Sequence, residues 1–430
     1  MLLTKMEHFS AAIFFSAPIV YRNSDCSYPY RQDSDFWYLT GISESHSVLM
    51  IIKYNDTMSK SIIFHQISNK YRKTWIGNVL NKKDIIKYYK IDNVYSYSKI
   101  NNCLYKLLNG LDIIYHAVGK WIYADEIILS ALDKLRNNRI KYHRYPHIQI
   151  DWRPIVHEMR LFKSALEIDI IKHACNITCN SILIAMKSSK INMYEYELAA
   201  MINYHFALDK SNPAYTTIVA SGKNTCILHY TKYNSIINNG DLILIDAGAE
   251  YKNYASDITR TFPVNGIFSK AQRDIYNIVL LALNTALNLY KPGTSIKEVT
   301  DYIIKLKIKC LMNLGILSGS LEELFINKAY LPFFMHNLSH WIGLDVHDVG
   351  YYGIDYNRIL EPGMVLTIEP GIYINETLNV PKIYKNIGIR IEDIIVITDH
   401  GNKNLSSHLT KNPDEIELVI QNKSNNNWKL

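Results

Sequence analysis

The chain has 430 residues, of which 48% are hydrophobic and 20% are charged, as in an ordinary soluble globular protein. This length exceeds what one hydrophobic core usually serves, so two domains are expected. The net charge of +7 is small, and the lysines are scattered among Asn, Ile and Tyr, so the charge describes a solvated surface and not a nucleic-acid-binding protein.

The cysteines and the apolar runs indicate the compartment. Six cysteines are widely spaced, without a zinc-ribbon pattern, which favours a reducing environment. No apolar run approaches the about 20 residues that span a bilayer. Lys5 and the apolar residues 11–15 resemble a signal peptide only faintly, because the run is short and Pro18 interrupts it. We therefore expect a cytoplasmic protein that binds neither membrane nor nucleic acid, and a first core strand at 11–15.

The first third of the chain alternates between strand and helix patterns, which predicts a mixed α/β domain. Charged residues surround an aromatic run at 36–38, and we interpret them as structural. A domain limit follows near Asp151-Trp-Arg-Pro154, and we place the domains at residues 1–155 and 156–430. The expected strands are 11–15, 48–54, 61–65 and 112–116, and the expected helices are 100–109 and 123–136.

A capping box opens the second domain. Ser164 is followed three residues later by Glu167, a pattern that predicts a helix from 165 to about 186. The other expected helices are 193–208, 272–291 and 295–314, and strand patterns lie at 218–221, 226–230, 241–251, 255–262, 364–369 and 387–397.

Two aspartates lie in neighbouring strand patterns. Asp246 and Asp257 are equidistant from the middle of the turn at 251–253, so a hairpin sets them side by side. Two carboxylates that close repel each other unless a cation lies between them. The structural alternative is that backbone amides or Arg260 cap each aspartate.

Two glutamates and an arginine follow later in the chain. Glu369 ends one strand pattern, and Glu392 lies in the next, on the face that it shares with Arg390. A single glutamate after an apolar run is usually an edge residue or a cap. Two of them, together with two buried aspartates, favour a binding site.

Three of the 15 histidines, His336, His340 and His347, fall within one short segment. Clustered imidazoles bind metal, transfer protons, or are core residues with satisfied hydrogen bonds. With His340 as the nitrogen donor, the four carboxylates suit ions such as Mn(II), Co(II) or Zn(II). We expect two ions about 3.5–4 Å apart that share a hydroxide, and Arg390 as a partner of a ligand carboxylate.

The order of these residues, Asp-x10-Asp, His, Glu and Glu, resembles the metallo-aminopeptidase clan with the pita-bread fold. The local motifs are similar to those of the bacterial Xaa-Pro aminopeptidases (the aminopeptidase P family). They are Tyr28-Pro-Tyr-Arg-Gln-Asp-Ser-Asp-Phe-Trp-Tyr38, Asp151-Trp-Arg-Pro154, Ile227-Leu-His229-Tyr230, Leu244-Ile-Asp246-Ala-Gly248, Asp257-Ile-Thr-Arg-Thr-Phe-Pro263, the segment 334–348, Thr367-Ile-Glu369-Pro-Gly371 and Gly388-Ile-Arg390-Ile-Glu392-Asp393.

This resemblance implies a mixed α/β N-terminal domain followed by a pita-bread catalytic domain. It implies an exopeptidase that releases the first residue from peptides with proline in the second position. It also implies two divalent ions, with manganese as the usual family metal, and a homo-oligomer, a tetramer or a dimer. The implied metal ligands are Asp246, Asp257, His340, Glu369 and Glu392, and the implied catalytic residues are His229, His336, His347 and Arg390.

Other readings remain open. A dipeptidase that cleaves Xaa-Pro shares every ligand, and a non-catalytic clan member acting as a binding module would have lost ligands, whereas all are present here. A metal-free amidinohydrolase would lack the acidic set. For the pocket wall around the substrate's proline we expect apolar residues near His229 and the histidine segment, with Tyr373 and Trp75 as weaker candidates.

Overall fold

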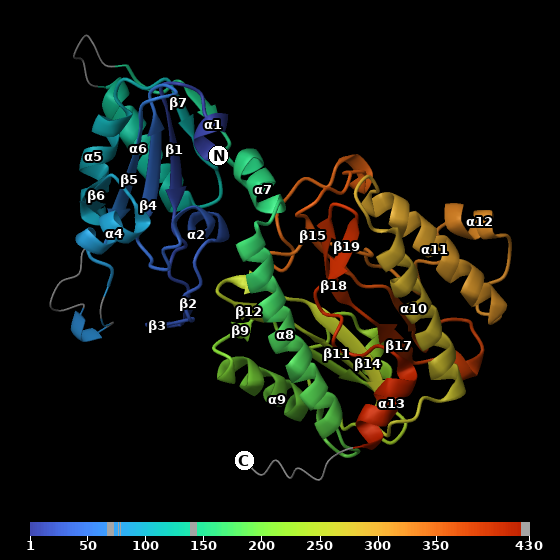
Figure 1. Cartoon of the computed structure of the whole chain (residues 1–430). Coiled ribbons are helices and arrows are strands. Elements are labelled where there is room, and N and C mark those ends of the chain that lie inside the picture. The colour runs from blue at the N-terminus through green and yellow to red at the C-terminus, as the bar shows by residue number, and fades with distance from the viewer. Residues whose placement is uncertain (67–72, 76, 78, 138–143, 423–430) are drawn as a thin grey trace. The chain divides into compact units, whose positions relative to one another are not determined.

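The chain forms two units, Met1–Arg160 and Leu161–Leu430. The structure is a computed structural model, and it describes residues 1–66, 73–75, 77, 79–137 and 144–422 (Figure 1). Helix α7 (Arg153–Leu161) contains the limit between the units, and the predicted limit at 155/156 also lies inside this helix. Every helix among the described residues is too short or too polar to cross a membrane.

The first unit contains a six-stranded mixed sheet. Its central strand β1 runs antiparallel to β4 and parallel to β7. Alternation along β1 divides the core, since Ala11, Ile13 and Phe15 pack with α5 and α6 while Ala12 and Phe14 pack on the other face. In sheet order the strands are β6 (Asn93–Ser96), β5 (Ser59–His65), β4 (Val48–Lys53), β1 (Ser10–Phe15), β7 (Ile113–Tyr115) and β8 (Ile148–Ile150). The remaining elements are α1 (Leu2–Lys5), β2 (Tyr21–Asn23), β3 (Cys26–Ser27), α2 (Ser34–Thr40), α4 (Lys82–Tyr89), η1 (Tyr97–Lys99), α5 (Ile100–Leu108) and α6 (Ile122–Arg136).

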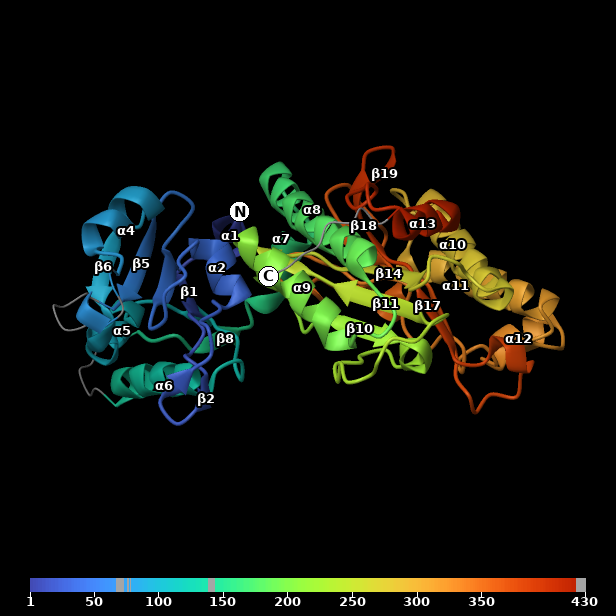
Figure 2. The ribbon, with the colours of Figure 1, turned by 90° about the horizontal axis from the view of Figure 1, so that it is seen from below.

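The second unit places short antiparallel sheets between two pairs of helices. Helices α8 and α9 cover one side of the strands, and α10 and α11 lie on the other side (Figures 1 and 2). The helices and turns are α8 (Ala165–Ser188), α9 (Glu195–Leu208), η2 (Gly222–Cys226), α10 (Lys270–Leu289), α11 (Ile296–Asn313), α12 (Leu321–Ile326), η3 (Ile354–Tyr356), η4 (Lys382–Tyr384) and α13 (Pro413–Gln421).

Among the described residues of this unit, the strands form four groups. The groups, in sheet order, are β10 (Ile218–Ser221), β11 (Leu242–Ala247) and β14 (Ile258–Pro263); β13 (Tyr254–Ala255), β12 (Ala249–Tyr251) and β9 (Asn212–Pro213); β15 (Val365–Ile368), β18 (Asp393–Thr398) and β19 (Gly401–Asn404); and β16 (Gly371–Ile374) with β17 (Ile387–Arg390).

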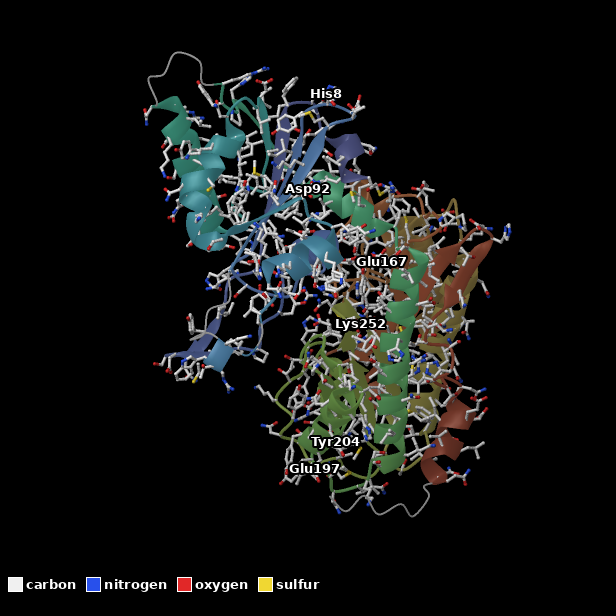
Figure 3. The ribbon with its side chains drawn as sticks, turned by 60° about the vertical axis from the view of Figure 1, so that its left-hand side comes forward. His8, Asp92, Glu167, Glu197, Tyr204 and Lys252 are labelled. Atoms are coloured by element: carbon white, nitrogen blue, oxygen red, sulfur yellow. The ribbon has the colours of Figure 1, made fainter. Side chains whose placement is uncertain are left out.

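The predicted capping box is present at the start of α8. The hydroxyl of Ser164 accepts from the backbone N–H of Glu167 at 3.4 Å, and the Glu167 carboxylate accepts from the backbone N–H of Ser164 at 2.8 Å. The other Glu167 oxygen accepts from the hydroxyl of Tyr254 at 2.8 Å, so the cap also joins the helix to β13. Figure 3 shows Glu167 at this helix, and Glu197 and Tyr204 on α9.

Three local expectations need correction. Asp246 pairs with Thr259 and not with Asp257, because the turn is centred on Lys252 and Asn253, which adopt positive φ angles of 49° and 65°. Residues 226–230 are no strand, since Cys226 ends the turn η2 and residues 227–230 follow it as an irregular segment. The strand expected at 387–397 is interrupted at 391–392, where the backbone N–H of Glu392 donates to the Thr259 carbonyl at 3.0 Å.

Candidate active site

Acidic residues from segments far apart in the sequence lie around one histidine inside the second unit. Ligand atoms of Asp257, His340 and Glu392 all lie within 4.8 Å of one another. Nε2 of His340 lies 3.5 Å from Oδ2 of Asp257 and 3.5 Å from Oε1 of Glu369. Asp257 precedes β14, Glu369 follows β15, and Glu392 lies between β17 and β18. Strand ends from three sheets therefore place these carboxylates around one ring nitrogen.

The hydrogen bonds of His340 orient its ring towards this cluster. Nδ1 lies 3.0 Å from the carbonyl oxygen of Trp341, and a carbonyl only accepts, so Nδ1 carries the hydrogen. In the neutral ring, the lone pair of Nε2 is then directed at the carboxylates. A backbone partner that sets the tautomer in this way is typical of metal-binding histidines.

The carboxylates of the cluster need positive charge nearby to remain ionised. Burial raises the pKa of Glu369 to about 7, and burial together with the neighbouring carboxylates raises the pKa of Glu392 well above its usual range. Burial opposes a charged His340, but Asp257 and Glu369 raise its pKa to about 9. Oε1 of Glu392 is buried and has no hydrogen-bond partner among the described residues. Protons thus compensate the carboxylates where no metal is bound, and this donor set fits divalent metal ions.

Tyr215 joins the fifth predicted ligand to the cluster. Its hydroxyl lies 2.5 Å from Oδ1 of Asp246 and 2.5 Å from Oδ1 of Asp257. Burial and these two carboxylates raise the pKa of Tyr215 well above its ordinary value, so the phenol remains a donor. We did not predict Tyr215 from the sequence, because a tyrosine that follows Asn212-Pro213 carries no local signal of this position.

Arg390 connects Asp246 to a second tyrosine. Its Nη2 donates to Oδ2 of Asp246 at 2.6 Å, and its Nη1 donates to the hydroxyl of Tyr373 at 2.8 Å. Arg390 is 4% exposed, so the guanidinium holds Asp246 from inside the protein. Burial raises the pKa of Asp246 to about 6, although Arg390 acts in the opposite direction.

His336 ends this chain of contacts. Its Nδ1 lies 2.8 Å from the carbonyl oxygen of Asn337, so Nδ1 donates, and its Nε2 accepts from the hydroxyl of Tyr373 at 3.0 Å. Burial and the positive charge of Arg390 lower the pKa of His336 to about 3. His336 is therefore a neutral imidazole with both nitrogens engaged. Tyr373, considered above as a wall residue, is 1% exposed and serves as the link between Arg390 and this ring.

The other two predicted histidines are exposed at the same place. The rings of His347 and His340 have centroids 4.4 Å apart, and burial beside His340 lowers the pKa of His347. His229 lies near enough to affect the pKa of both His336 and His347. Among the described residues, neither His229 nor His347 has a hydrogen-bond partner. Both rings are thus available to a substrate.

Arg260 does not cap the aspartates. Its Nη2 donates to Oδ1 of Asp393 at 2.8 Å, and its Nη1 donates to the backbone carbonyl of Glu392 at 2.6 Å. This buried arginine holds the interrupted strand in place behind the site.

A buried glutamate on α9 organises the irregular segment that carries His229. Oε1 of Glu195 accepts from the backbone N–H and hydroxyl of Ser221, both at 2.8 Å, and from Nδ2 of Asn224 at 3.0 Å. Oε2 accepts from the hydroxyl of Tyr230 at 2.8 Å and from the backbone N–H of Ser235 at 3.1 Å. Five donors from both ends of the segment converge on one carboxylate, next to His229.

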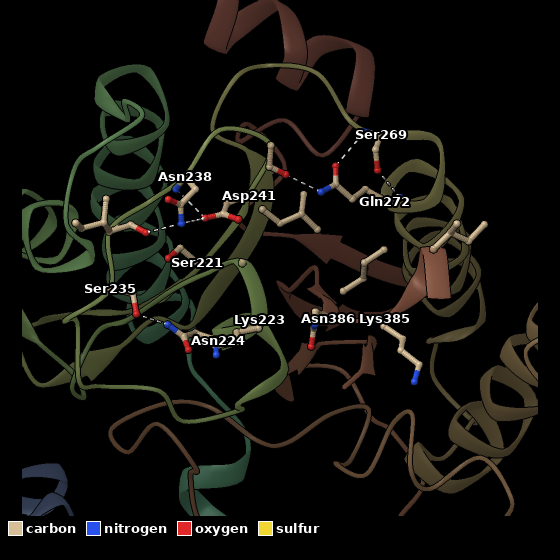
Figure 4. A pocket seen from close by; sticks show the side chains of 16 residues that line it. Ser221, Lys223, Asn224, Ser235, Asn238, Asp241, Ser269, Gln272, Lys385 and Asn386 are labelled. Atoms are coloured by element: carbon tan, nitrogen blue, oxygen red, sulfur yellow. Dashed lines mark hydrogen bonds between the residues drawn. The ribbon is translucent and has the colours of Figure 1, made fainter. Parts of the chain in front are cut away.

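A cavity of the unit borders the donors to Glu195, since Ser221, Asn224 and Ser235 line it. It has a volume of about 460 Å³ and lies between the segment after β10, β11 and the beginning of α10 (Figure 4). Polar groups in it are paired with one another, since Asp241 accepts from the backbone N–H of Asn238 at 2.7 Å and Gln272 donates to the Gly240 carbonyl at 2.9 Å. None of the predicted site residues is among the described residues that line it. Trp75 belongs to the first unit, where it is 72% exposed.

Comparisons with known proteins agree with this geometry. The model of metallopeptidase family M24 matches residues 169–399, and the model of the aminopeptidase P N-terminal domain matches residues 1–115. The fold and the cluster are those of a metallopeptidase.

Similar sequences and solved structures cover almost the whole chain. The chain is 51% identical to the Xaa-Pro aminopeptidase of Escherichia coli, over 97% of this chain and 95% of that protein, and 42% identical to that of Haemophilus influenzae, over 97% and 94%. An aspartate-to-alanine variant of Escherichia coli aminopeptidase P superposes with a TM-score of 0.97 at 50% identity, covering 98% of this chain and 96% of that chain. The zinc-substituted enzyme with product gives 0.97 at 51% identity, with the same coverage. The chain belongs to metallopeptidase family M24 and, within it, to the bacterial Xaa-Pro aminopeptidases, which confirms the predicted pita-bread catalytic domain behind a mixed α/β N-terminal domain.

Proposed function

We propose that this chain is a metal-dependent aminopeptidase that releases the first residue from peptides with proline in the second position. The observation that carries this proposal is the gathering of ligand atoms from Asp257, His340 and Glu392 in one buried cluster. It occurs in a chain that shares 51% of its residues with an Xaa-Pro aminopeptidase.

The proposed ligands for two divalent metal ions are the five residues predicted from the sequence, Asp246, Asp257, His340, Glu369 and Glu392. When bound, such a pair of ions lowers the pKa of a water molecule towards neutrality and polarises the scissile carbonyl. We propose manganese as the metal, because the resemblance implies it as the usual family metal, and the oxygen-rich set with one imidazole suits manganese, cobalt or zinc.

The remaining polar residues have two proposed roles. Arg390 holds Asp246 directly and, through Tyr373, keeps the neutral His336 in a fixed orientation. The exposed rings of His229 and His347 meet the substrate. Because the amide nitrogen must gain a proton when it leaves, we assign proton transfer at that nitrogen to His347 and alignment of the peptide to His229.

Proline in the second position explains why shape and a placed proton donor are needed. An Xaa-Pro bond is a tertiary amide without an N–H. The substrate therefore lacks the hydrogen-bond donor that many peptidases use to align the scissile bond. The ring must be held by its surface, while the free α-amine is recognised by the acidic cluster. This predicts release of one residue and no action on N-acetylated peptides.

The test measures kcat/KM for Xaa-Pro-Yaa, Xaa-Ala-Yaa and N-acetyl-Xaa-Pro-Yaa peptides and for the dipeptide Xaa-Pro, with metal analysis of the same sample. We expect rapid cleavage of the first peptide, much slower cleavage of the second and none of the acetylated one. Preference for the dipeptide would indicate a dipeptidase, and bound metal without any cleavage would indicate a binding module.

Assembly and location complete the proposal. We propose a homo-oligomer, a tetramer or a dimer, in the cytoplasm. Light scattering of the purified protein measures the mass of the assembly, and a monomeric mass at working concentration would contradict it.

A further inference from the structure

A buried lysine borders the candidate active site. Lys307, on α11, is 5% exposed, and its Nζ lies 3.7 Å from the centre of the Phe334 ring. Nζ of Lys307 lies 3.5 Å from the backbone carbonyl oxygen of Gly371, a distance longer than an ordinary hydrogen bond. No carboxylate among the described residues forms an ion pair with Lys307, and burial lowers its pKa to about 7. An ammonium group is costly to bury in such surroundings unless an anion joins it.

Lys307 lines a cavity that reaches the metal-ligand cluster. The cavity has a volume of about 140 Å³, and Glu369 and His336 form the wall that it shares with the cluster. Apolar side chains such as Ile303, Phe334 and Leu338 form much of the remainder. A small, largely apolar space with one cation fits a single side chain that has an apolar stem and an anionic end.

We propose that this cavity receives the side chain of the substrate's first residue and that Lys307 selects acidic side chains there. The inference rests on the proposed function, because it uses recognition of the free α-amine at the acidic cluster. With the amine held beside Glu369, the adjoining side chain begins at the mouth of the cavity. A glutamate or aspartate carboxylate that reaches Nζ forms a charge-assisted hydrogen bond in a place shielded from water. Lys307 is thus a residue for specificity and not for the chemical step.

The kinetic test compares Glu-Pro-Yaa with Gln-Pro-Yaa peptides, which have nearly equal size and differ in charge. For the native enzyme with its metals we expect kcat/KM to be ~10–100-fold higher for the glutamate peptide, as for hydrogen bonds between charged groups. Lys307→Met should abolish this preference, because kcat/KM should fall ~10–100-fold more for the glutamate peptide than for the glutamine peptide. Lys307→Arg should retain part of the preference, because it keeps the charge.

Lys305→Met is a matched control. It makes the same change two residues away on α11, where the side chain is 41% exposed and lies 3.9 Å from Glu322. Lys305→Met should keep the native preference for glutamate. Equal kcat/KM for both peptides in the native enzyme, or an equal loss in the two variants, would overturn the proposal.

A binding measurement separates this inference from the proposed function. Calorimetry with free L-glutamate and L-glutamine on the metal-loaded protein should show tighter binding of glutamate, and Lys307→Met should remove the difference. If no Xaa-Pro peptide is cleaved but this difference is present, the function fails and the acidic subsite stands. If both amino acids bind equally, the subsite fails whatever the enzyme cleaves.

Discussion

Two buried acidic clusters, one in each unit, compensate their charge in opposite ways. In the first unit, Asp35 is 3% exposed and its oxygens lie 2.6 Å from Nζ of Lys120, 2.7 Å from Nη1 of Arg160 and 3.5 Å from Nε2 of His157. Burial opposes ionisation, but these partners hold the pKa of Asp35 far below its usual range.

In the second unit, burial outweighs the cationic partners for most of the carboxylates. Three buried carboxylates and the half-buried Glu369 face Arg390 and His340. Burial raises the pKa of Glu392, Glu369 and Asp246, whereas His340 overcomes burial and lowers the pKa of Asp257. Burial acts in the same direction on both clusters, so the supply of cationic side chains makes the difference. A cluster that carries its own cations is structural, whereas a cluster short of cations binds them from outside.

Removal of one carboxylate from the second cluster should have the largest effect. Glu392→Ala deletes a ligand and a compensating charge together, so metal affinity should fall by more than the ~10–100-fold typical of outer partners. Activity should fall with it, and both are measured by metal analysis and kcat/KM. Glu376→Ala, at an exposed glutamate of the same unit, is the control. Normal metal content with normal turnover in Glu392→Ala would contradict the assignment.

Loss of an exposed imidazole should separate chemistry from metal binding. His347→Ala should keep its metals and lose ~10²–10⁴-fold in kcat, the usual cost of a positioned acid or base. Metal content and kcat are measured on the same preparation. Loss of the metals in this variant would instead show that His347 is a ligand. His340 would then not be the single nitrogen donor.

Loss of the central carboxylate in the first unit should reduce stability and not metal content. Asp35→Ala removes a charged partner of the buried Arg160 and leaves the half-buried Lys120 with Asp33 as its carboxylate partner, which should cost about 3–5 kcal/mol in the free energy of unfolding. Denaturant unfolding measures the loss, and metal analysis should show normal occupancy.

The pH dependence of stability gives a second measurement on Asp35. Because its folded pKa is lowered, its contribution is fully present above the unfolded pKa of about 3.9 and declines as pH falls towards the folded value. The native protein should therefore lose stability more steeply below about pH 4 than Asp35→Ala does. Parallel curves would show that Asp35 is not the compensated group described here.

Glu195 sharpens the comparison, because its five donors are hydrogen-bonding groups without charge. Glu195→Gln should disorder the segment with His229 and lower kcat/KM by ~10–100-fold, as for other outer partners of a site. In the His229→Ala background the same change should add little, since Glu195 acts through that ring. Glu197→Gln on the same helix is the control, and equal added losses in both backgrounds would refute the positioning role.

Local pattern was sufficient to predict most of the helices and strands and to single out the candidate ligands. An acid inside an apolar strand, as at Asp246, or directly after one, as at Glu369, is visible in the sequence because burial of a carboxylate is costly anywhere in the chain. The cap at Ser164 and Glu167 is equally local, since both partners lie within one helical turn. The resemblance to a family supplied the roles of these residues, and those roles remain predictions.

Long-range contacts set the features that the sequence analysis missed or placed differently. The bridge from Tyr215 to both aspartates joins residues that lie 31 and 42 positions apart, and the position of Lys307 beside Gly371 joins residues 64 apart. The register of Asp246 depended on a turn with two residues at positive φ, and the state of His336 depended on Tyr373 and Arg390. Hydrogen bonds, burial and the pKa of a side chain depend on which distant segments surround it, and residue order alone does not contain that information.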